Sequence, residues 1–148
     1  MLARGMAGAI VVAALMAACG APPAPEPKSN PALDAAASEG TRYTMVSLIG
    51  IGDIVLAPEA MITSDGQRIP IRVVSPGVWA FPNPPSKLTN GENFCFSKPV
   101  TFFTLHEHED GVLAINVGDW SRPPSVPAAD QWSVDGGCGL STYKLTEG

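Results

Sequence analysis

The stretch Val100–Trp120, VTFFTLHEHEDGVLAINVGDW, decides the fold class. Two runs rich in aromatic, β-branched and aliphatic residues flank the polar triplet Glu109-Asp110-Gly111. This pattern is typical of a β-hairpin whose three-residue loop ends in a left-handed glycine. We therefore predict two antiparallel strands, residues 100–107 and 112–118.

The register of this hairpin follows from the alternation of side chains across a strand. A two-residue loop would mix apolar and polar side chains on each face, whereas a three-residue loop sorts them. The expected core-facing pairs are Phe103–Val117, Leu105–Ile115 and Glu107–Leu113. The opposite face, which we expect to be solvated, carries Thr104, His106 and His108 beside Asn116, Ala114 and Val112.

The sequence after residue 40 continues in the same way. Runs of β-branched and aromatic residues alternate with Gly, Pro, Asn and Asp at spacings of about 8 to 12 residues, and no helical period is sustained. The expected fold is all-β, a small antiparallel sandwich or barrel. The other predicted strands are Arg42–Ile49, Asp53–Leu56, Ala60–Thr63, Gln67–Val74, Val78–Phe81, Gln131–Val134 and Leu140–Leu145, with proline-rich loops at Pro82–Pro85 and Pro123–Pro127.

Residues 1–18 have the pattern of a secretory signal peptide. One basic side chain, Arg4, precedes the uncharged run Met6–Ala17 of Ala, Gly, Ile, Val, Leu and Met. A membrane-spanning helix needs about 20 apolar residues, and this run is shorter. We therefore expect the chain to be exported.

The segment Leu15-Met16-Ala17-Ala18-Cys19 resembles the lipobox of bacterial lipoproteins, in which the cysteine is lipidated and becomes the new N-terminus. The small residues and the cysteine match, whereas Met16 stands where that family usually has Leu. Gly20 resembles the residue found in lipoproteins sent to the outer membrane of Gram-negative bacteria. The resemblance covers residues 1–20 and implies attachment to the membrane through Cys19. The alternative is an ordinary signal peptide with an incidental cysteine.

Residues 19–40 are expected to form the lipidated N-terminus and a flexible tether. Five prolines at positions 22, 23, 25, 27 and 31 favour an extended polyproline II conformation, and the Ala and Ser residues that follow offer little for a core. Residues 41–148 are then the single β domain, facing the periplasm.

The chain contains three cysteines. Lipidation of Cys19 would leave Cys95 and Cys138, which we expect to form a disulfide, because disulfides persist in exported proteins. The chain-entropy model assigns such a bridge about 4 kcal/mol. The alternatives are two buried thiols or a cysteine-only metal site, and the absence of a CxxC pair disfavours the metal site.

The charge of the exported chain argues against nucleic acid as a partner. Removing residues 1–18 deletes Arg4 from the 9 basic side chains, which leaves 8 against 14 acidic ones and a formal charge of −6. The acidic residues are scattered, and the sequence contains no basic patch that could release counterions from phosphates.

His106 and His108 are the chain's two histidines and the one candidate for metal or catalytic chemistry. Two imidazoles on one strand could bind a zinc-like ion, with an oxygen from Glu109 or Asp110. No third ligand stands at a diagnostic spacing, and the sequence has no GxSxG motif or reactive-cysteine context. We expect a solvated hairpin tip and assign no catalytic residue, metal or cofactor.

Trp79 and Phe81 precede the sequence PNPP, and Trp120 precedes SRPP. Exposed, these rings would form a candidate interaction patch; otherwise they close the ends of the core. Two function classes follow. The favoured one is a non-catalytic envelope module that binds or inhibits another protein, because it needs only a rigid scaffold and loops. The alternative is a small periplasmic metal-binding protein or enzyme that uses His106 and His108.

Overall fold

The computed structural model describes residues 29–88, 95–96 and 98–146. The predicted signal peptide and Cys19 lie outside the described residues. Among the described residues, no helix has the length and hydropathy to cross a membrane.

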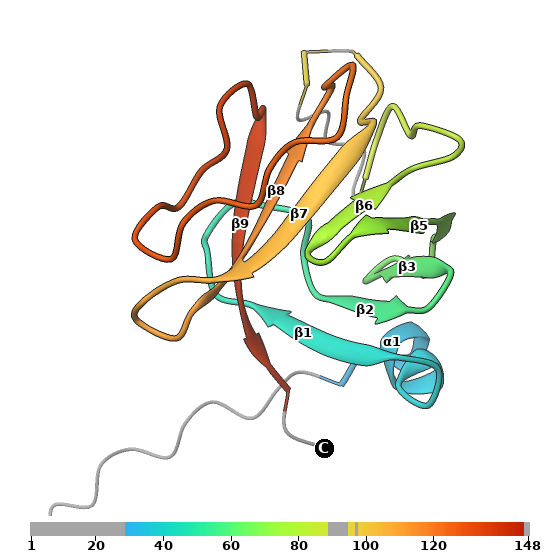
Figure 1. The fold of residues 1–148 in the computed structure, drawn as a ribbon. Coiled ribbons are helices and arrows are strands. Elements are labelled where there is room, and N and C mark those ends of the chain that lie inside the picture. Colours follow the sequence, from blue (N-terminus) through green and yellow to red (C-terminus); the bar gives the residue numbers. More distant parts are fainter. Residues whose placement is uncertain (1–28, 89–94, 97, 147–148) are drawn as a thin grey trace, which may run out of the picture.

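In the part of the chain that the structure describes, nine antiparallel strands form one sheet that curls into a nearly closed barrel (Figure 1). The all-β prediction is confirmed. The order in the sheet is β4-β3-β2-β1-β9-β8-β7-β6-β5, so β4 and β5 lie at its two ends although Ile71 alone separates them in the chain. The strands are β1 (Thr41–Met45), β2 (Ile54–Ala57), β3 (Ala60–Thr63), β4 (Arg68–Pro70), β5 (Arg72–Ser75), β6 (Val78–Ala80), β7 (Phe102–Glu107), β8 (Leu113–Gly118) and β9 (Gly139–Leu145).

The central hairpin of β7 and β8 has the predicted register. Phe103 pairs with Val117, Leu105 with Ile115 and Glu107 with Leu113. The loop is the expected three-residue one: Gly111 has φ 79°, and the N–H of His108 donates to the carbonyl of Val112 at 2.8 Å. Sorting of apolar and polar side chains was therefore enough to fix this pairing.

The main core lies inside the curled sheet. Phe103 and Tyr143 are its largest fully buried side chains. The ring of Trp79 lies parallel to that of Phe103, with centroids 5.0 Å apart, and the ring of Phe81 lies 5.3 Å from the same phenyl group. The other buried members are Ile51, Ile54, Met61, Ile69, Ile71, Leu88, Cys95, Val100, Ile115 and Val117.

A short helix, α1 (Pro31–Ala36), packs on the outside of this sheet. Its Leu33 and Ala36 lie three residues apart on one face and are buried against a second cluster formed with Val55, Ala57 and Ile62. The side chain of Asn30 caps the helix by accepting from the N–H groups of Ala32 and Leu33 at 3.1 and 3.2 Å. The domain boundary predicted at residue 41 is therefore corrected: the folded part includes residues 30–40, and α1 is not tether.

Two predicted strands differ from the structure in more than their end points, and a third, predicted at Arg42–Ile49, already ends at Met45. The strand predicted at Gln67–Val74 is divided into β4 and β5 at Ile71, whose N–H donates to the carbonyl of Glu59 at 3.0 Å. Gln131–Val134 forms no strand, because its backbone groups bond to side chains of the central hairpin. Both segments have the composition of strands, and tertiary contacts decide their conformation.

The predicted disulfide joins Cys95 to Cys138, with Cα atoms 5.1 Å apart. It connects the segment before β7 to the residue just before β9. The expected bridge is therefore confirmed.

Candidate functional site

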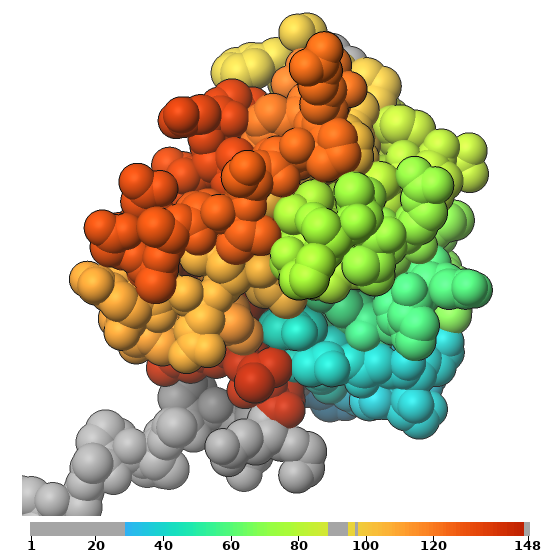
Figure 2. Space-filling view, viewed as in Figure 1, coloured from blue at the N-terminus to red at the C-terminus, as the bar shows by residue number. Residues whose placement is uncertain are grey.

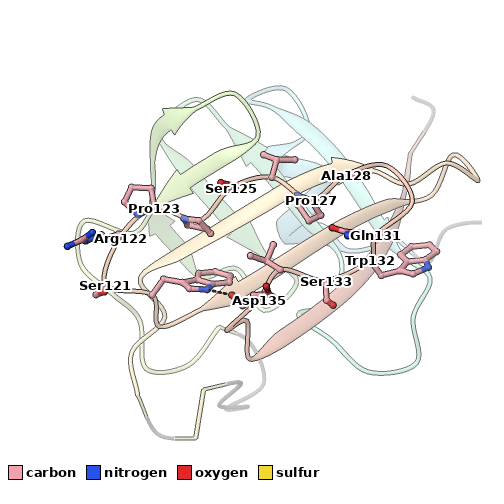
Figure 3. A pocket seen from close by; sticks show the side chains of 14 residues that line it. Ser121, Arg122, Pro123, Ser125, Pro127, Ala128, Gln131, Trp132, Ser133 and Asp135 are labelled. Atoms are coloured by element: carbon pink, nitrogen blue, oxygen red, sulfur yellow. Dashed lines mark hydrogen bonds between the residues drawn. The ribbon is translucent and has the colours of Figure 1, made fainter.

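The connection from β8 to β9 is the longest one between neighbouring strands that the structure describes in full. Most of it is a segment that we call the proline-rich loop, residues 120–135. It contains no helix or strand and crosses the outer side of the sheet, in front of β7, β8 and β9 (Figure 3). The indole N–H of Trp120 donates to the carbonyl of Asp135 at 2.8 Å, which joins the two ends of the loop. The loop is therefore a closed Ω-type loop, a class that is frequently functional.

Asn116 attaches the second half of this loop to β8. Its side chain is buried, 1 % exposed, on the outer face of the hairpin. Its Nδ2 donates to the carbonyl of Trp132 at 3.0 Å, and its Oδ1 accepts from the N–H of Val134 at 3.3 Å. The amide side chain of Asn116 thus forms hydrogen bonds with two backbone groups of the loop. The same two bonds provide partners for the buried amide itself.

His106 attaches the loop to β7. Its Nε2 lies 2.8 Å from the carbonyl oxygen of Gln131, so this ring nitrogen is the donor. A backbone bond from the N–H of Glu109 to the carbonyl of Ala129, also 2.8 Å, holds the same stretch. His106 is 8 % exposed. The prediction of a solvated histidine face is therefore wrong, because the proline-rich loop covers it.

His108 makes the third attachment, at the end of the hairpin. Its imidazole stacks on the indole of Trp132, with centroids 3.6 Å apart and planes at 12°. Its Nδ1 lies 3.1 Å from a carboxylate oxygen of Asp110. The N–H of Val112 lowers the pKa of that carboxyl group below its ordinary value, and His108 adds to the effect. His108 is therefore a packing residue between the hairpin tip and the loop.

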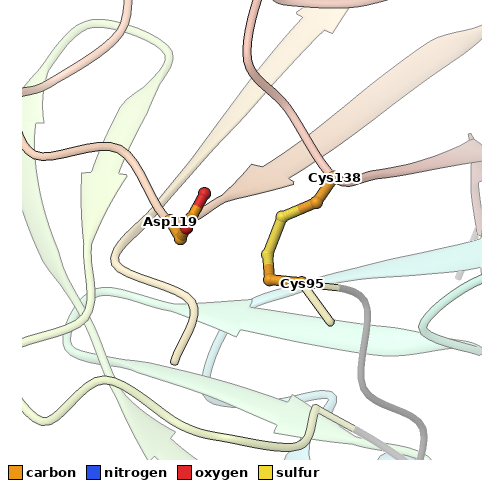
Figure 4. Close-up of side chains that lie close together, drawn as sticks. All are labelled: Cys95, Asp119 and Cys138. Carbon is orange, nitrogen blue, oxygen red and sulfur yellow. A yellow bond between two sulfur atoms is a disulfide. The ribbon is translucent and has the colours of Figure 1, made fainter. Parts of the chain in front are cut away.

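These contacts leave the two histidines poorly placed as a metal-binding pair. His106 Nε2 is bonded to Gln131, and His108 is stacked and paired with Asp110. The described part of the chain contains one group of three possible metal ligands, Cys95, Asp119 and Cys138 (Figure 4). Their donor atoms lie within 4.8 Å of one another. Both sulfur atoms of that group form the disulfide, and Asp119 pairs with Lys98 at 3.2 Å.

A groove of about 840 Å³ lies along the loop, between its first and second halves. This volume is in the range of ligand-binding clefts, about 300 to 1,000 Å³. Its walls combine eight apolar residues with six polar ones. They are formed by Trp120, Ser121, Arg122, Pro123, Pro124, Ser125, Val126, Pro127, Ala128, Gln131, Trp132, Ser133, Val134 and Asp135 (Figure 3).

The first half of the loop also contacts the turn between β5 and β6. A Cβ atom at Gly77 would lie 2.9 Å from a methyl carbon of Val126, so these two segments are in close contact. Figure 2 shows the orange atoms of the loop meeting the yellow-green atoms of this turn on the front surface. The loop is therefore supported along its length.

The predicted aromatic patch is not one surface. Phe81 is 3 % exposed, and Trp79 stacks on Phe103, so both rings close the core. Trp120 lies on the opposite side of the sheet, where its ring covers Gly118. Of the three predicted patch residues, the structure places Trp120 alone in the groove.

Sequence reasoning missed the contributions of Asn116, Gln131 and Trp132. One signal was present: Asn116 interrupts the apolar run of β8, and a buried amide requires hydrogen-bond partners. The partners themselves carry no local signal, since Gln131 and Trp132 use backbone carbonyls.

Comparison of the chain with protein-family models, with curated proteins and with solved structures found no match in any of the three. The functional argument therefore depends on the geometry of the proline-rich loop.

Proposed function

We propose that this chain is an envelope lipoprotein whose β domain is a non-catalytic protein-binding module. In this proposal, lipidated Cys19 anchors the chain in the outer membrane, and the domain in the periplasm binds another envelope protein through the proline-rich loop. One observation carries the proposal: an irregular loop is held in a fixed conformation by buried side chains while its outer side stays exposed.

The attachments of the loop support a binding role because they reduce the entropy lost on binding. Trp120 closes the loop, Asn116 and His106 hold its second half, and His108 stacks on Trp132. Prolines at 123, 124 and 127 restrict the backbone of the first half. A binding surface that is ordered in advance loses less conformational freedom when its partner arrives.

The composition of the groove supports a peptide segment as the ligand. Two tryptophans, three prolines and two valines line it, and aromatic residues with Arg are enriched where proteins bind tightly. Arg122 is exposed and has no ion-pair partner among the described residues. The groove therefore suits an extended segment that presents apolar side chains and a carboxylate to Arg122.

The engagement of both histidines supports this module over the alternative of a metal-binding protein or enzyme. A ligand pair or a general base needs a free ring nitrogen directed at an accessible site. His106 and His108 are instead buried, and they hold the loop in place through a hydrogen bond and a ring stack.

Site-specific photo-crosslinking in the native envelope tests the proposal. A photoreactive residue at the exposed Ser125 should give an adduct of one discrete mass with an envelope protein, and the same residue at the exposed Glu59 should not. Arg122→Glu should reduce the adduct strongly, whereas Arg122→Lys, which keeps the charge, should retain much of it. Equal adducts from both positions, or an adduct that ignores Arg122→Glu, would contradict the assigned site.

The anchor is tested separately. Cys19→Ser should release the protein from the membrane fraction, while the fold and the disulfide of the domain remain intact. A parent protein recovered entirely in the soluble periplasmic fraction would contradict the lipid anchor without affecting the argument for the loop.

A further inference from the structure

The β1–β2 loop, residues 46–53, exposes aliphatic side chains far more than any other loop that the structure describes. Leu48 is 100 % exposed and Ile49 is 74 % exposed, and the neighbouring Val46 is 46 % exposed. Its first seven residues, VSLIGIG, contain no charged residue, and Asp53 completes the loop at its base. Exposed single aliphatic residues are common, but two adjacent ones at a loop tip lose much of the favourable burial that such residues normally gain.

The base of this loop is fixed to β9. The N–H of Val46 donates to the carbonyl of Thr142 at 2.8 Å, and the N–H of Ile51 donates to Ser141 Oγ at 3.1 Å. The side chain of Ile51 is buried in the core, 1 % exposed. The tip residues are therefore displayed by an anchored loop.

A second hydrogen-bonded support lies at the end of the loop. Tyr143 donates its hydroxyl hydrogen to the carbonyl of Gly52 at 3.1 Å, and Asp53 accepts from the N–H of Met45 at 2.9 Å. The one carboxylate of the loop, Asp53, is thus held by a backbone N–H at the base of the loop. The exposed tip residues Leu48 and Ile49 carry no charge.

The length of chain before the domain places a bilayer within reach of this loop. From Cys19 to Asn30 there are eleven residues, which span up to about 34 Å when extended as polyproline II. The five residues of β1, which lead into the loop, span about 17 Å. A chain anchored at Cys19 can therefore bring Leu48 and Ile49 to the membrane surface.

We propose that the β1–β2 loop is a second membrane contact, in which Leu48 and Ile49 insert into the lipid bilayer that holds the acylated Cys19. The inference rests on the proposed lipid anchor. It follows from two adjacent, largely exposed aliphatic side chains at the uncharged tip of an anchored loop within reach of the membrane. Lipid-anchored proteins commonly combine one lipid chain with a second membrane signal, and the inserted loop would add a second contact.

The chemistry of the loop favours lipid over protein as the occupant. Energetically dominant residues at protein interfaces are enriched in Trp, Tyr and Arg, and Leu is under-represented. Leu and Ile enter the apolar part of a bilayer favourably, and the loop has no Lys or Arg to attract anionic headgroups. Because the exported chain carries a formal charge of −6, anionic lipid should not strengthen the contact.

Photo-crosslinking to lipid tests the inference with the lipidated full-length mature protein in phosphatidylcholine vesicles. A photoreactive residue at position 48 should give phospholipid adducts by mass spectrometry. The matched control is position 73 on β5, where Val73 is also aliphatic and is 57 % exposed. We expect adduct formation at 73 to be at background. Replacing half of the phosphatidylcholine by phosphatidylglycerol should not raise the yield at position 48.

Flotation of the vesicles separates failure of the anchor from failure of the loop contact. Protein that does not float with the vesicles contradicts the lipid anchor and, with it, the second contact. Protein that floats but gives equal lipid adducts at positions 48 and 73, or none at 48, overturns the loop contact alone. A protein adduct in place of lipid at position 48 in the native envelope overturns it as well.

Discussion

The imidazole of His108 lies flat against the indole of Trp132, with ring centroids 3.6 Å apart and planes at 12°. This stack connects the tip of the β7–β8 hairpin to the proline-rich loop, beside the bond from His106 to Gln131. The two histidines therefore stabilise the loop. Their replacement should lower the free energy of unfolding, rather than remove a catalytic or metal-binding activity.

His106→Ala should lower the free energy of unfolding by about 1 to 3 kcal/mol, because it removes a buried ring and leaves the carbonyl of Gln131 without its donor. Urea denaturation measures the change. Glu107→Ala is the matched control: Glu107 is the exposed neighbour on the same strand, and its replacement should change stability by less than about 0.5 kcal/mol. Equal effects of the two variants would contradict the role assigned to His106.

Gly118→Ala should detach one end of the proline-rich loop. A Cβ atom at residue 118 would lie 2.6 Å from ring carbons of Trp120, so the indole would have to move and would lose its bond to Asp135. We expect faster cleavage within residues 121–135 in limited proteolysis and a loss of stability of about 1 to 3 kcal/mol. An unchanged cleavage rate would show that the loop does not depend on the position of Trp120.

Leu33→Ala tests whether α1 belongs to the folded domain. Leu33 is fully buried against Val55 and Ile62, so its truncation should lower the free energy of unfolding by about 2 to 5 kcal/mol. Ala35→Ser, at an exposed position of the same helix, should have little effect. A tether in place of a docked helix would make both changes neutral in thermal denaturation.

Tyr143→Phe should reduce the sensitivity of the domain to alkali. Burial raises the pKa of Tyr143 above the ordinary tyrosine value, as it also does for Tyr43. The neutral phenol is therefore the form that the fold favours: its contribution to stability is complete below about pH 10 and is lost as the pH rises further. Urea midpoints measured from about pH 8 to pH 11 should fall less steeply in the variant.

At neutral pH the same variant should be less stable by about 1 kcal/mol, because the carbonyl of Gly52 loses its donor. Tyr43 still titrates in the variant, so part of the alkaline loss should remain. Identical pH dependence in the parent and the variant would contradict the assignment to Tyr143.

Replacing Cys95 and Cys138 together by Ala should lower stability by about 2 to 5 kcal/mol. The measurement is urea denaturation of the variant and of the parent without reductant. Thiol labelling of the denatured, unreduced parent should find neither cysteine free. Labelling of both cysteines would contradict the bridge.

The sequence predicted the parts of the fold that depend on local alternation. The β7–β8 register follows from the sorting of apolar side chains, and the disulfide from the number of cysteines. It did not predict that the outer face of this hairpin is covered. A solvated polar face and a face covered by a loop have the same residue types, and the difference depends on a segment 16 residues further along, from Asn116 to Trp132.

The helix α1 was missed for another reason. Its six residues include one proline and three alanines, and the buried pair Leu33 and Ala36 is too short a pattern to show a helical period. The Asn30-Pro31 start is a proper capping signal, but it lies within a stretch whose prolines favour extended chain. Only contact with Val55 and Ile62 distinguishes the two interpretations.

The disulfide between Cys95 and Cys138 has a further consequence for a chain that is cut by a protease. It joins residues 43 positions apart, and the proline-rich loop lies between them. A protease that cut the exposed part of that loop would open a covalent ring without dividing the molecule. The two fragments would stay joined by the bridge and by the strands on either side, so the nicked chain would remain one molecule. Under the proposed function, such a cut would leave a protein that is still anchored but has lost the conformation of its binding loop.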